Sequence, residues 1–505
     1  MNIERRHFTA TFPKPGLAWA SPGQRSGETN PLRMFFNDRV LTTLRILIVL
    51  ATGLTLASLS SSAQTTKHVA TGQDLQSALT EAAESGTDYV VNLAAGTYSA
   101  NFNFNTTGAN NLTLQGETGV TNSQIFVDGA GGSMSLKANG NANITVKGIT
   151  FARQGGTGLY ISTDTGADVQ IQDFVFAPTT TGGGGDDRSI VSAQNAAVSG
   201  CTAAGGGLIG GGLTATGLAG DLTMFKSSAI SNIYSVITSV GNRIGGGLYA
   251  EIIGNINVSN NVFIANVSDH WGSAAHLSGG GVSLVGNVFN NNVSNYGYKS
   301  VAGYANSLSA ANNAFSGNQG KGLSFGAREY VLRAISFMSN SATALSATGT
   351  TGTLSGNTFA FNSTAAYVQA SALTVRENLF LNNSQESDDS AAEFDFRALS
   401  ASSKRFAGNG NISANPNTGR GGAMYCRGSA LSVSNNVFTG NSGSYDGGAP
   451  AVYARESGET KKFGLSGNTV RKNAAGVVGS AVSETSGRML LANNLLANNS
   501  AAIRS

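Results

Sequence analysis

The stretch Asn261-Val-Phe-Ile-Ala-Asn266 decides the fold, because its pattern Asn-x-Phe-x-x-Asn returns throughout the second half of the chain. Further complete copies begin at Asn287, Asn313, Asn357, Asn378 and Asn436. Four partial copies place their apolar residue at Phe337, Phe406, Val470 and Leu496. Successive apolar anchors lie 21 to 32 residues apart, and a period of about 20–50 residues indicates a solenoid.

The residues before each anchor identify the repeating element as a β-strand. Apolar pairs stand seven and five positions upstream, for example Ile256 and Val258 before Phe263, with polar or small residues mostly between them. This period of two is typical of a strand with one buried face. Helical repeats are excluded by the lack of a 3.6-residue period and by 67 glycines in 505 residues, and the leucine ladder of leucine-rich repeats is missing.

We therefore predict an all-β fold, a single right-handed parallel β-helix solenoid with a short N-terminal capping helix and roughly 16–19 coils. Each coil stacks about 4.8 Å from the next, so equivalent residues align. Asn at a fixed turn position can hydrogen-bond to its own kind in neighbouring coils and tolerates left-handed backbone. The predicted structural ladder consists of Phe263, Asn266, Phe289, Asn292, Phe315, Asn318, Phe359, Asn362, Phe380, Asn383, Phe438 and Asn441.

The start of the repeat array carries one helical pattern, at residues 73–84. Asp74 is the expected cap, and Leu75, Ala78, Leu79 and Ala82 form one apolar stripe. Such a helix would cover the open apolar end of the first coil. We expect residues 64–110 to hold this helix and the first coils, and residues 111–505 to form the β-helix, with no matching cap visible at the C-terminus.

Residues 1–63 have the character of a signal region. Arg39 and Arg45 precede the apolar run Ile46–Ala57, and Ser61-Ser62-Ala63 follows it. The order predicts cleavage after Ala63, and an initiator at Met34 would make residues 1–33 an over-extended start. The apolar run is too short to favour a membrane span, and we expect none in the mature chain. The protein is therefore expected to be secreted or held at the bacterial cell surface.

Charge and cysteine content narrow the classes of partner. The formal net charge of +3 becomes −1 without residues 1–63, which carry seven of the basic and three of the acidic residues. The mature chain thus has no net basic field to attract nucleic acid. Two cysteines, Cys201 and Cys426, exclude a disulfide-stapled scaffold; buried thiols are the expectation, and a disulfide is the alternative.

Two resemblances follow from these motifs. The helix-then-strand opening from Asp74 to Phe104 resembles the start of many proteins of the pectate-lyase-like β-helix superfamily. The coil motif, with Gly-Gly-Ala sequences such as Gly447-Gly448-Ala449 six residues after Asn441, resembles the passenger repeats of chlamydial polymorphic outer-membrane proteins. The second resemblance covers about residues 255–500 and implies a surface-exposed, adhesin-like passenger.

Catalytic motifs of the pectate-lyase-like enzymes are met only in part. The Arg-x-Pro-x-x-Arg signature of pectate lyases is absent, since Phe176, Ala414 and Gly448 stand two residues before the prolines of the mature chain. Asp164 lies 22 residues before Asp186 in the sequence. Stacked one coil apart, Asp164, Asp186 and Asp187 would offer the paired carboxylates of glycoside hydrolysis, as in polygalacturonases. A glycine-rich loop before an acidic pair is the alternative, because the companion His and Arg motifs do not follow.

The densest acidic segment is the second candidate site. Residues 386–395 carry Glu386, Asp388, Asp389, Glu393 and Asp395. Carboxylates are the oxygen ligands that Ca²⁺ prefers, and a bound Ca²⁺ could bridge to an acidic polysaccharide. A solvated acidic loop is the plainer interpretation, and we expect no other cofactor.

Two functions follow as hypotheses. The first is a non-enzymatic, adhesin-like scaffold that binds a polysaccharide or cell-surface glycan through many weak contacts along its flank. The second is a polysaccharide lyase or glycoside hydrolase acting on an acidic polysaccharide. Charged side chains brought together from consecutive coils, within about 5 Å on the outer surface, would favour the second, because fold alone does not supply activity.

Overall fold

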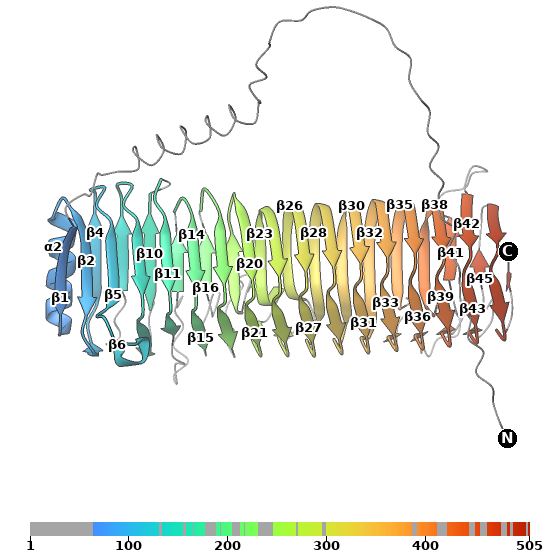
Figure 1. The fold of residues 1–505 in the computed structure, drawn as a ribbon, viewed down its shortest axis with the longest axis horizontal. Coiled ribbons are helices and arrows are strands. Elements are labelled where there is room, and N and C mark those ends of the chain that lie inside the picture. The colour runs from blue at the N-terminus through green and yellow to red at the C-terminus, as the bar shows by residue number, and fades with distance from the viewer. Residues whose placement is uncertain are drawn as a thin grey trace, which may run out of the picture. The chain divides into compact units, whose positions relative to one another are not determined.

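The computed structural model describes residues 64–130, 134–154, 158–164, 166–176, 188–191, 193–204, 213–216, 218–230, 246–268, 271–294, 299–385, 391–411, 422–443, 450–454, 462–475, 482–484, 488–500 and 503–504. They belong to one compact unit, Ser62–Ser505. Every strand pairing in this unit is parallel and joins one coil to the next, so the fold is a parallel β-helix, as the repeat predicts (Figure 1). Cys201 and Cys426 are both buried free thiols, as expected.

One sheet contains the strand that carries the apolar anchor of each coil. It has sixteen strands, which fits the expected number of coils. They are β3 (Gly96–Tyr98), β6 (Ile125–Ala130), β9 (Thr150–Gln154), β12 (Val175–Phe176), β15 (Thr202–Ala204), β18 (Ser228–Ile230), β21 (Val262–Ile264), β24 (Val288–Asn290), β27 (Ala314–Ser316), β29 (Ser336–Met338), β31 (Thr358–Ala360), β33 (Leu379–Leu381), β36 (Arg405–Ala407), β39 (Val437–Thr439), β43 (Thr469–Arg471) and β47 (Leu495–Ala497).

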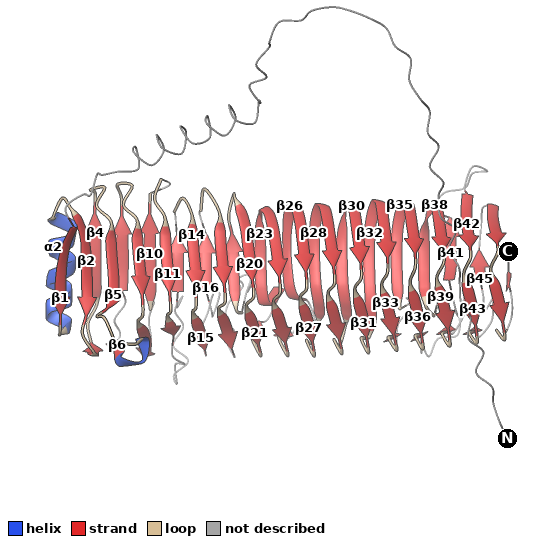
Figure 2. Ribbon diagram, viewed as in Figure 1, coloured by secondary structure: helices blue, strands red, loops and turns tan. Residues whose placement is uncertain are grey.

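A second sheet of 26 strands forms the rest of the wall (Figure 2). In the middle coils a single long strand takes the place of the two shorter strands that the outer coils contribute to this sheet. The long strands are β23 (Trp271–Val285), β26 (Lys299–Ala311), β28 (Lys321–Arg333), β30 (Thr343–Ser355), β32 (Thr364–Arg376), β35 (Ala392–Ser402) and β38 (Met424–Ser434). The flanking strands are β1 (Gln64–Val69), β2 (Asp88–Leu93), β4 (Phe102–Thr106), β5 (Leu112–Gly116), β7 (Met134–Ala138), β8 (Ile144–Lys147), β10 (Leu159–Thr163), β11 (Val169–Gln172), β13 (Arg188–Val191), β14 (Ala196–Ser199), β16 (Leu213–Thr216), β17 (Leu222–Phe225), β19 (Leu248–Glu251), β20 (Asn255–Ser259), β41 (Pro450–Ala454), β42 (Lys462–Ser466), β45 (Val482–Glu484), β46 (Arg488–Ala492) and β48 (Ile503–Arg504).

Two small sheets complete the coils. One pairs β22 (Val267–Ser268) with β25 (Val293–Ser294). The other joins β34 (Ser384–Gln385), β37 (Gly410–Asn411), β40 (Ser442–Gly443) and β44 (Ala474–Ala475). These short pairings follow the Asn that ends each motif, where the chain turns toward the next long strand.

The helix α2 (Gly72–Glu84) lies at the N-terminal end of the stack, with Leu75, Ala78, Leu79 and Ala82 buried (Figure 1). The expected cap at Asp74 is wrong. Thr71 is the N-cap residue, and its hydroxyl accepts a hydrogen bond from the backbone N–H of Asp74. Thr71 fits because its backbone is extended while its side chain reaches an unpaired N–H of the first turn.

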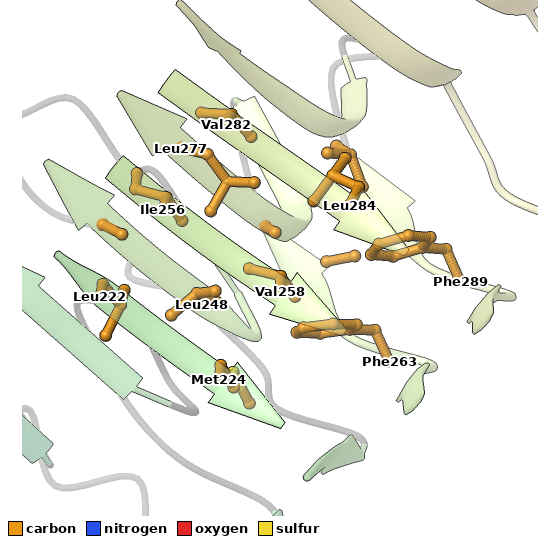
Figure 3. Packing of buried hydrophobic residues seen from close by; sticks show 14 of the residues in the cluster. Leu222, Met224, Leu248, Ile256, Val258, Phe263, Leu277, Val282, Leu284 and Phe289 are labelled. Atoms are coloured by element: carbon orange, nitrogen blue, oxygen red, sulfur yellow. The ribbon is translucent and has the colours of Figure 1, made fainter. Parts of the chain in front are cut away.

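The anchors form a continuous column inside the coils. Phe263 pairs in register with Phe289 (Figure 3). The column continues without a register shift to Leu496. Eight phenylalanine rings stack with centroids 4.4 to 5.1 Å apart. The rings pack on aliphatic residues such as Leu277 and Leu284, which are also fully buried.

Both asparagines of the motif form buried hydrogen-bond ladders. The second Asn of each copy gives an unbroken column of ten: Asn266, Asn292, Asn318, Asn340, Asn362, Asn383, Asn409, Asn441, Asn473 and Asn499. Left-handed backbone belongs to the residue before the ladder Asn, such as Ala265 or Asn291, and not to the ladder Asn as expected. That preceding residue makes the bend, and the Asn that follows turns inward.

Candidate functional site

Side chains that point away from the core on the first half of the long strands form a polar face. They alternate with core residues such as Leu277, Phe325 and Phe394, as the strand period requires. Two rows run across the coils on this face. Row one is Tyr249, His276, Ala302, Ser324, Ser346, Tyr367, Glu393 and Tyr425. Row two is Glu251, Ser278, Tyr304, Gly326, Thr348, Gln369, Asp395 and Arg427.

The centre of the polar face has small side chains in row one. Ala302, Ser324 and Ser346 are buried although they lie outside the core. Beside them in row two, Tyr304 is 53% exposed. The ring of Tyr304 is therefore the exposed group at the centre of the face, and the small side chains of row one do not project beyond it.

One end of the polar face carries charges of both signs. Glu393 and Asp395 are nearly buried on β35, and Arg427 lies on the next coil, with its Nη2 4.0 Å from a Glu393 carboxylate oxygen. The guanidinium also lies over the Tyr425 ring, 5.6 Å from its centroid. A hydrogen bond to the Tyr425 hydroxyl, together with the nearby Glu393 and Asp395, raises the pKa of Arg427. We name these four residues the charged cluster.

The other end holds a buried histidine. The His276 ring stacks on the Tyr249 ring, with centroids 5.4 Å apart, and the Tyr249 hydroxyl donates a hydrogen bond to Glu251. Burial lowers the pKa of His276 to about 4, so the ring is neutral at pH 7. Its Nδ1 is buried with no hydrogen-bond partner among the described residues. Burial also raises the pKa of Tyr249, to about 12.

Two lysines lie at the edge of the face, as the first residues of β26 and β28. Trp271 pairs with Lys299 in register, and Lys299 pairs with Lys321. The Lys299 ammonium lies 4.7 Å from the centroid of the Trp271 ring. Gly272, with φ of 72°, makes the register shift that separates Trp271 from the regular strand starting at Ala275. The shift holds Trp271 at the coil's edge while the rest of β23 stays in register.

The structure places the sequence candidates unequally. Asp164 is exposed in the turn after β10, while Asp186 and Asp187 lie outside the described residues. Of the acidic segment, Glu386, Asp388 and Asp389 also lie outside them. In the part of the chain that the structure describes, no group of three or more His, Cys, Asp or Glu side chains is placed to hold a metal ion.

The acidic-loop interpretation placed Glu393 and Asp395 in a loop. In the structure both residues belong to strand β35. The signal was present in Glu393-Phe-Asp395-Phe396, where acids alternate with buried rings, and again in Tyr425-Cys-Arg427. The histidine and lysine end of the face was missed, because no repeated spacing marks Tyr249, His276 or Lys299.

A search for membrane-spanning helices and two comparisons with known proteins add to this description. Across the described ranges, no helix has the length and apolar character needed to cross a lipid bilayer. Neither the known protein-family models nor the curated proteins contain a match to this chain.

Proposed function

We propose that this chain is an exported, surface-located β-helix that binds an extended polysaccharide along its polar face. The observation that carries the proposal is the two rows of outward side chains, which place tyrosines and charged groups at both ends of a strip of small residues. Tyrosine rings offer apolar surface to a sugar, and polar neighbours satisfy its hydroxyls. Weak contacts repeated over consecutive coils add up when one polymer spans them.

Export and kinship belong to the same proposal. The apolar run before Ala63 supports removal of residues 1–63, and such a cleavage would leave β1 intact because that strand begins at Gln64. The helix-capped parallel β-helix supports kinship with the pectate-lyase-like superfamily. The motif repeats support a relation to the chlamydial passengers, with adhesin-like use. No resident cofactor and no nucleic-acid partner are proposed. Ca²⁺ bound through the acidic segment is proposed as a bridge to the polymer, and the polymer assay below tests it.

The test compares two exposed aromatic residues. Tyr304→Ala removes a ring that is 53% exposed on the polar face, whereas Phe361→Ala removes one that is 58% exposed in the turn after β31. We expect Tyr304→Ala to weaken binding to a panel of purified polysaccharides several-fold, measured by affinity electrophoresis, and Phe361→Ala to leave it unchanged. Assays with and without Ca²⁺ test the metal. Equal behaviour of the two variants, or no binding by the wild type, contradicts the proposal.

The charged cluster favours cleavage of the polymer as a second candidate function. Alternate residues of a strand lie about 6.6 Å apart on one face, and the carboxyl pairs of glycoside hydrolases are about 5–9.5 Å apart. Glu393 and Asp395 have this relation, and Arg427 approaches Glu393 from the adjacent coil. Two acids on one coil and an arginine on the next, with the Arg427 Nη2 4.0 Å from a Glu393 carboxylate oxygen, favour an enzyme over a passive scaffold.

Product analysis separates binding from cleavage. Incubation with uronate polymers would release new reducing ends in hydrolysis, or unsaturated product absorbing in the ultraviolet in elimination. We expect Glu393→Gln and Asp395→Asn each to abolish such turnover, while Asp164→Asn, a change at an exposed turn, preserves it. Binding without any product contradicts the second function and leaves the first in place.

A further inference from the structure

The edge of the polar face contains two positive charges on adjacent coils. Lys299 and Lys321 occupy equivalent positions on adjacent coils, which lie about 4.8 Å apart. Within the described ranges, no carboxylate forms an ion pair with either lysine. Burial, and next the charge of Lys321, lower the pKa of Lys299. Adjacent like charges of this kind are unfavourable in the free protein, and an anion placed between them relieves the repulsion.

The groups around the lysines complete a binding site. The Trp271 ring is partly exposed and already holds Lys299 over one face. On the same coil as Trp271, His276 is only 6% exposed, and its Nδ1 finds no hydrogen-bond partner in the part of the chain that the structure describes. Burial has the larger effect in lowering the pKa of His276, and the charge of Lys299 also lowers it. A buried polar atom left unpaired costs free energy unless a ligand or water satisfies it.

We propose that Trp271, Lys299, Lys321 and His276 form a subsite for the anionic group of an acidic sugar, a carboxylate or a sulfate ester. The two ammonium groups bind the anion through charge-assisted hydrogen bonds. The Trp271 ring packs against the sugar, as aromatic side chains do in carbohydrate sites, and the neutral His276 ring supplies a polar contact at the base. The subsite rests on the proposed function in one respect, that its natural ligand is part of a polysaccharide.

Trp271 itself reports on the subsite. The chain has two tryptophans, Trp19 and Trp271, so the full chain with Trp19→Phe has one emitter, located beside Lys299. The probes are galacturonate for the carboxylate, galactose 6-sulfate for the sulfate ester, and galactose as the neutral control. We expect a saturable fluorescence change with at least one anion and none with galactose. The anion that titrates identifies which of the two groups the subsite takes.

Charge-matched variants test the lysines. Lys299→Gln with Lys321→Gln removes two charges from the subsite. The control variant, Lys137→Gln with Lys147→Gln, removes two positive charges outside the subsite. Lys137 is a matched control for Lys299, because its ammonium also lies over an aromatic ring, 5.5 Å from the centroid of Tyr160. We expect the first pair to weaken the anion response about tenfold or more and the second pair to leave it unchanged. Circular dichroism confirms folding, and Lys321→Gln alone provides a milder variant.

The outcomes for subsite and function are separable. A subsite is overturned if no anion changes the fluorescence, or if the Lys299–Lys321 variant responds like the wild type. The second outcome is that the wild type and this variant bind polygalacturonate and dextran sulfate equally well. Polymer binding then does not depend on the lysines, so the subsite is wrong while the proposed function stands. If small anions titrate Trp271 but no polymer binds, the subsite stands and the proposed function is wrong.

Discussion

The coils before and after about residue 260 are tied together by different hydrogen-bond ladders. In the N-terminal coils a ladder runs along the starts of the strands through Asp88, Asn111, Asn143, Asp168, Asn195, Asp221 and Asn255. Each side-chain oxygen accepts a hydrogen bond from the backbone N–H of the next member. Because only an oxygen acceptor is needed, Asp and Asn both occur. Asn143 and Asn255 are exposed, and the other members are half-buried.

The C-terminal ladders impose a stricter requirement. The Nδ2 of Asn292 donates to the Phe263 carbonyl of the previous coil and to the Oδ1 of Asn318 in the next, and that Oδ1 also accepts the Asn292 backbone N–H. Both the amide nitrogen and the oxygen are fully used inside the protein, where water cannot replace a lost partner. Burial, more than hydrogen bonding as such, therefore determines which residue type each ladder position accepts. A position that accepts one residue type gives a repeat that can be recognised in the sequence.

Breaking the buried ladder should have the largest effect. Asn318→Ala removes the oxygen that accepts from both the backbone N–H and the Nδ2 of Asn292. It also removes the Nδ2 that donates to the Phe289 carbonyl and to the Asn340 Oδ1, which keeps only the bond from the backbone N–H of residue 318. Each buried unpaired group costs about 1–3 kcal/mol, so we expect a loss of about 3 kcal/mol or more in the free energy of unfolding. Chemical denaturation measures the loss, and hydrogen exchange should locate it in the neighbouring coils. A loss below about 1 kcal/mol would contradict the ladder's energetic role.

Restoring an interrupted ladder should have the next largest effect. The first Asn of the motif forms a second buried column, in which Lys404 stands between Asn378 and Asn436. The ammonium is buried without a partner among the described residues, and burial lowers its pKa to about 7. We expect Lys404→Asn to raise the free energy of unfolding by about 2 kcal/mol at pH 7, because it removes a buried unpaired group.

The pH dependence of this gain gives the check. The folded pKa of Lys404, about 7, lies below the ordinary value of 10.5, so the unfolded chain binds more protons between these pH values. Wild-type stability therefore falls as the pH drops from about 10.5 to 7 and is not lowered further by this group below 7. The advantage of Lys404→Asn should be greatest near pH 7 and small near pH 10.5. Ile335→Asn, at the other interruption, carries no charge and should show no such dependence.

Much of the C-terminal fold could be predicted from the sequence because its constraints repeat. Phe263, Asn266 and their equivalents recur at nearly constant spacing, and each must match the coil above and below. The N-terminal ladder could not be predicted in the same way. Asp88 and Asn111 serve the same purpose with different side chains, and their spacing varies with the loops between them.

The candidate site was less predictable than the fold, because a site departs from the repeat. Glu393 and Asp395 were recognised as an acidic segment, but their neighbours Tyr425 and Arg427 depend on the register of β35 with β38. Lys299 and Lys321 stand 22 residues apart, and only the coil length brings them together. A residue type that occurs only once along a row of the face produces no periodic pattern in the sequence. Its neighbours therefore become known only from the fold.

The smallest expected effect comes from Asn143→Asp in the N-terminal ladder, and its comparison with the same exchange in the buried ladder distinguishes the two ladders most directly. Asn143 is exposed, and its Oδ1 accepts the Asp168 N–H at 2.7 Å. Asn143→Asp keeps that acceptor, as Asp168 and Asp221 already do at equivalent positions, so we expect a change within about 0.5 kcal/mol. The same exchange at Asn318 removes two donated hydrogen bonds and buries a carboxylate, which should destabilise the protein by several-fold more than Asn143→Asp does. Thermal unfolding of the two variants compares them, and similar melting temperatures would show that burial does not separate the ladders.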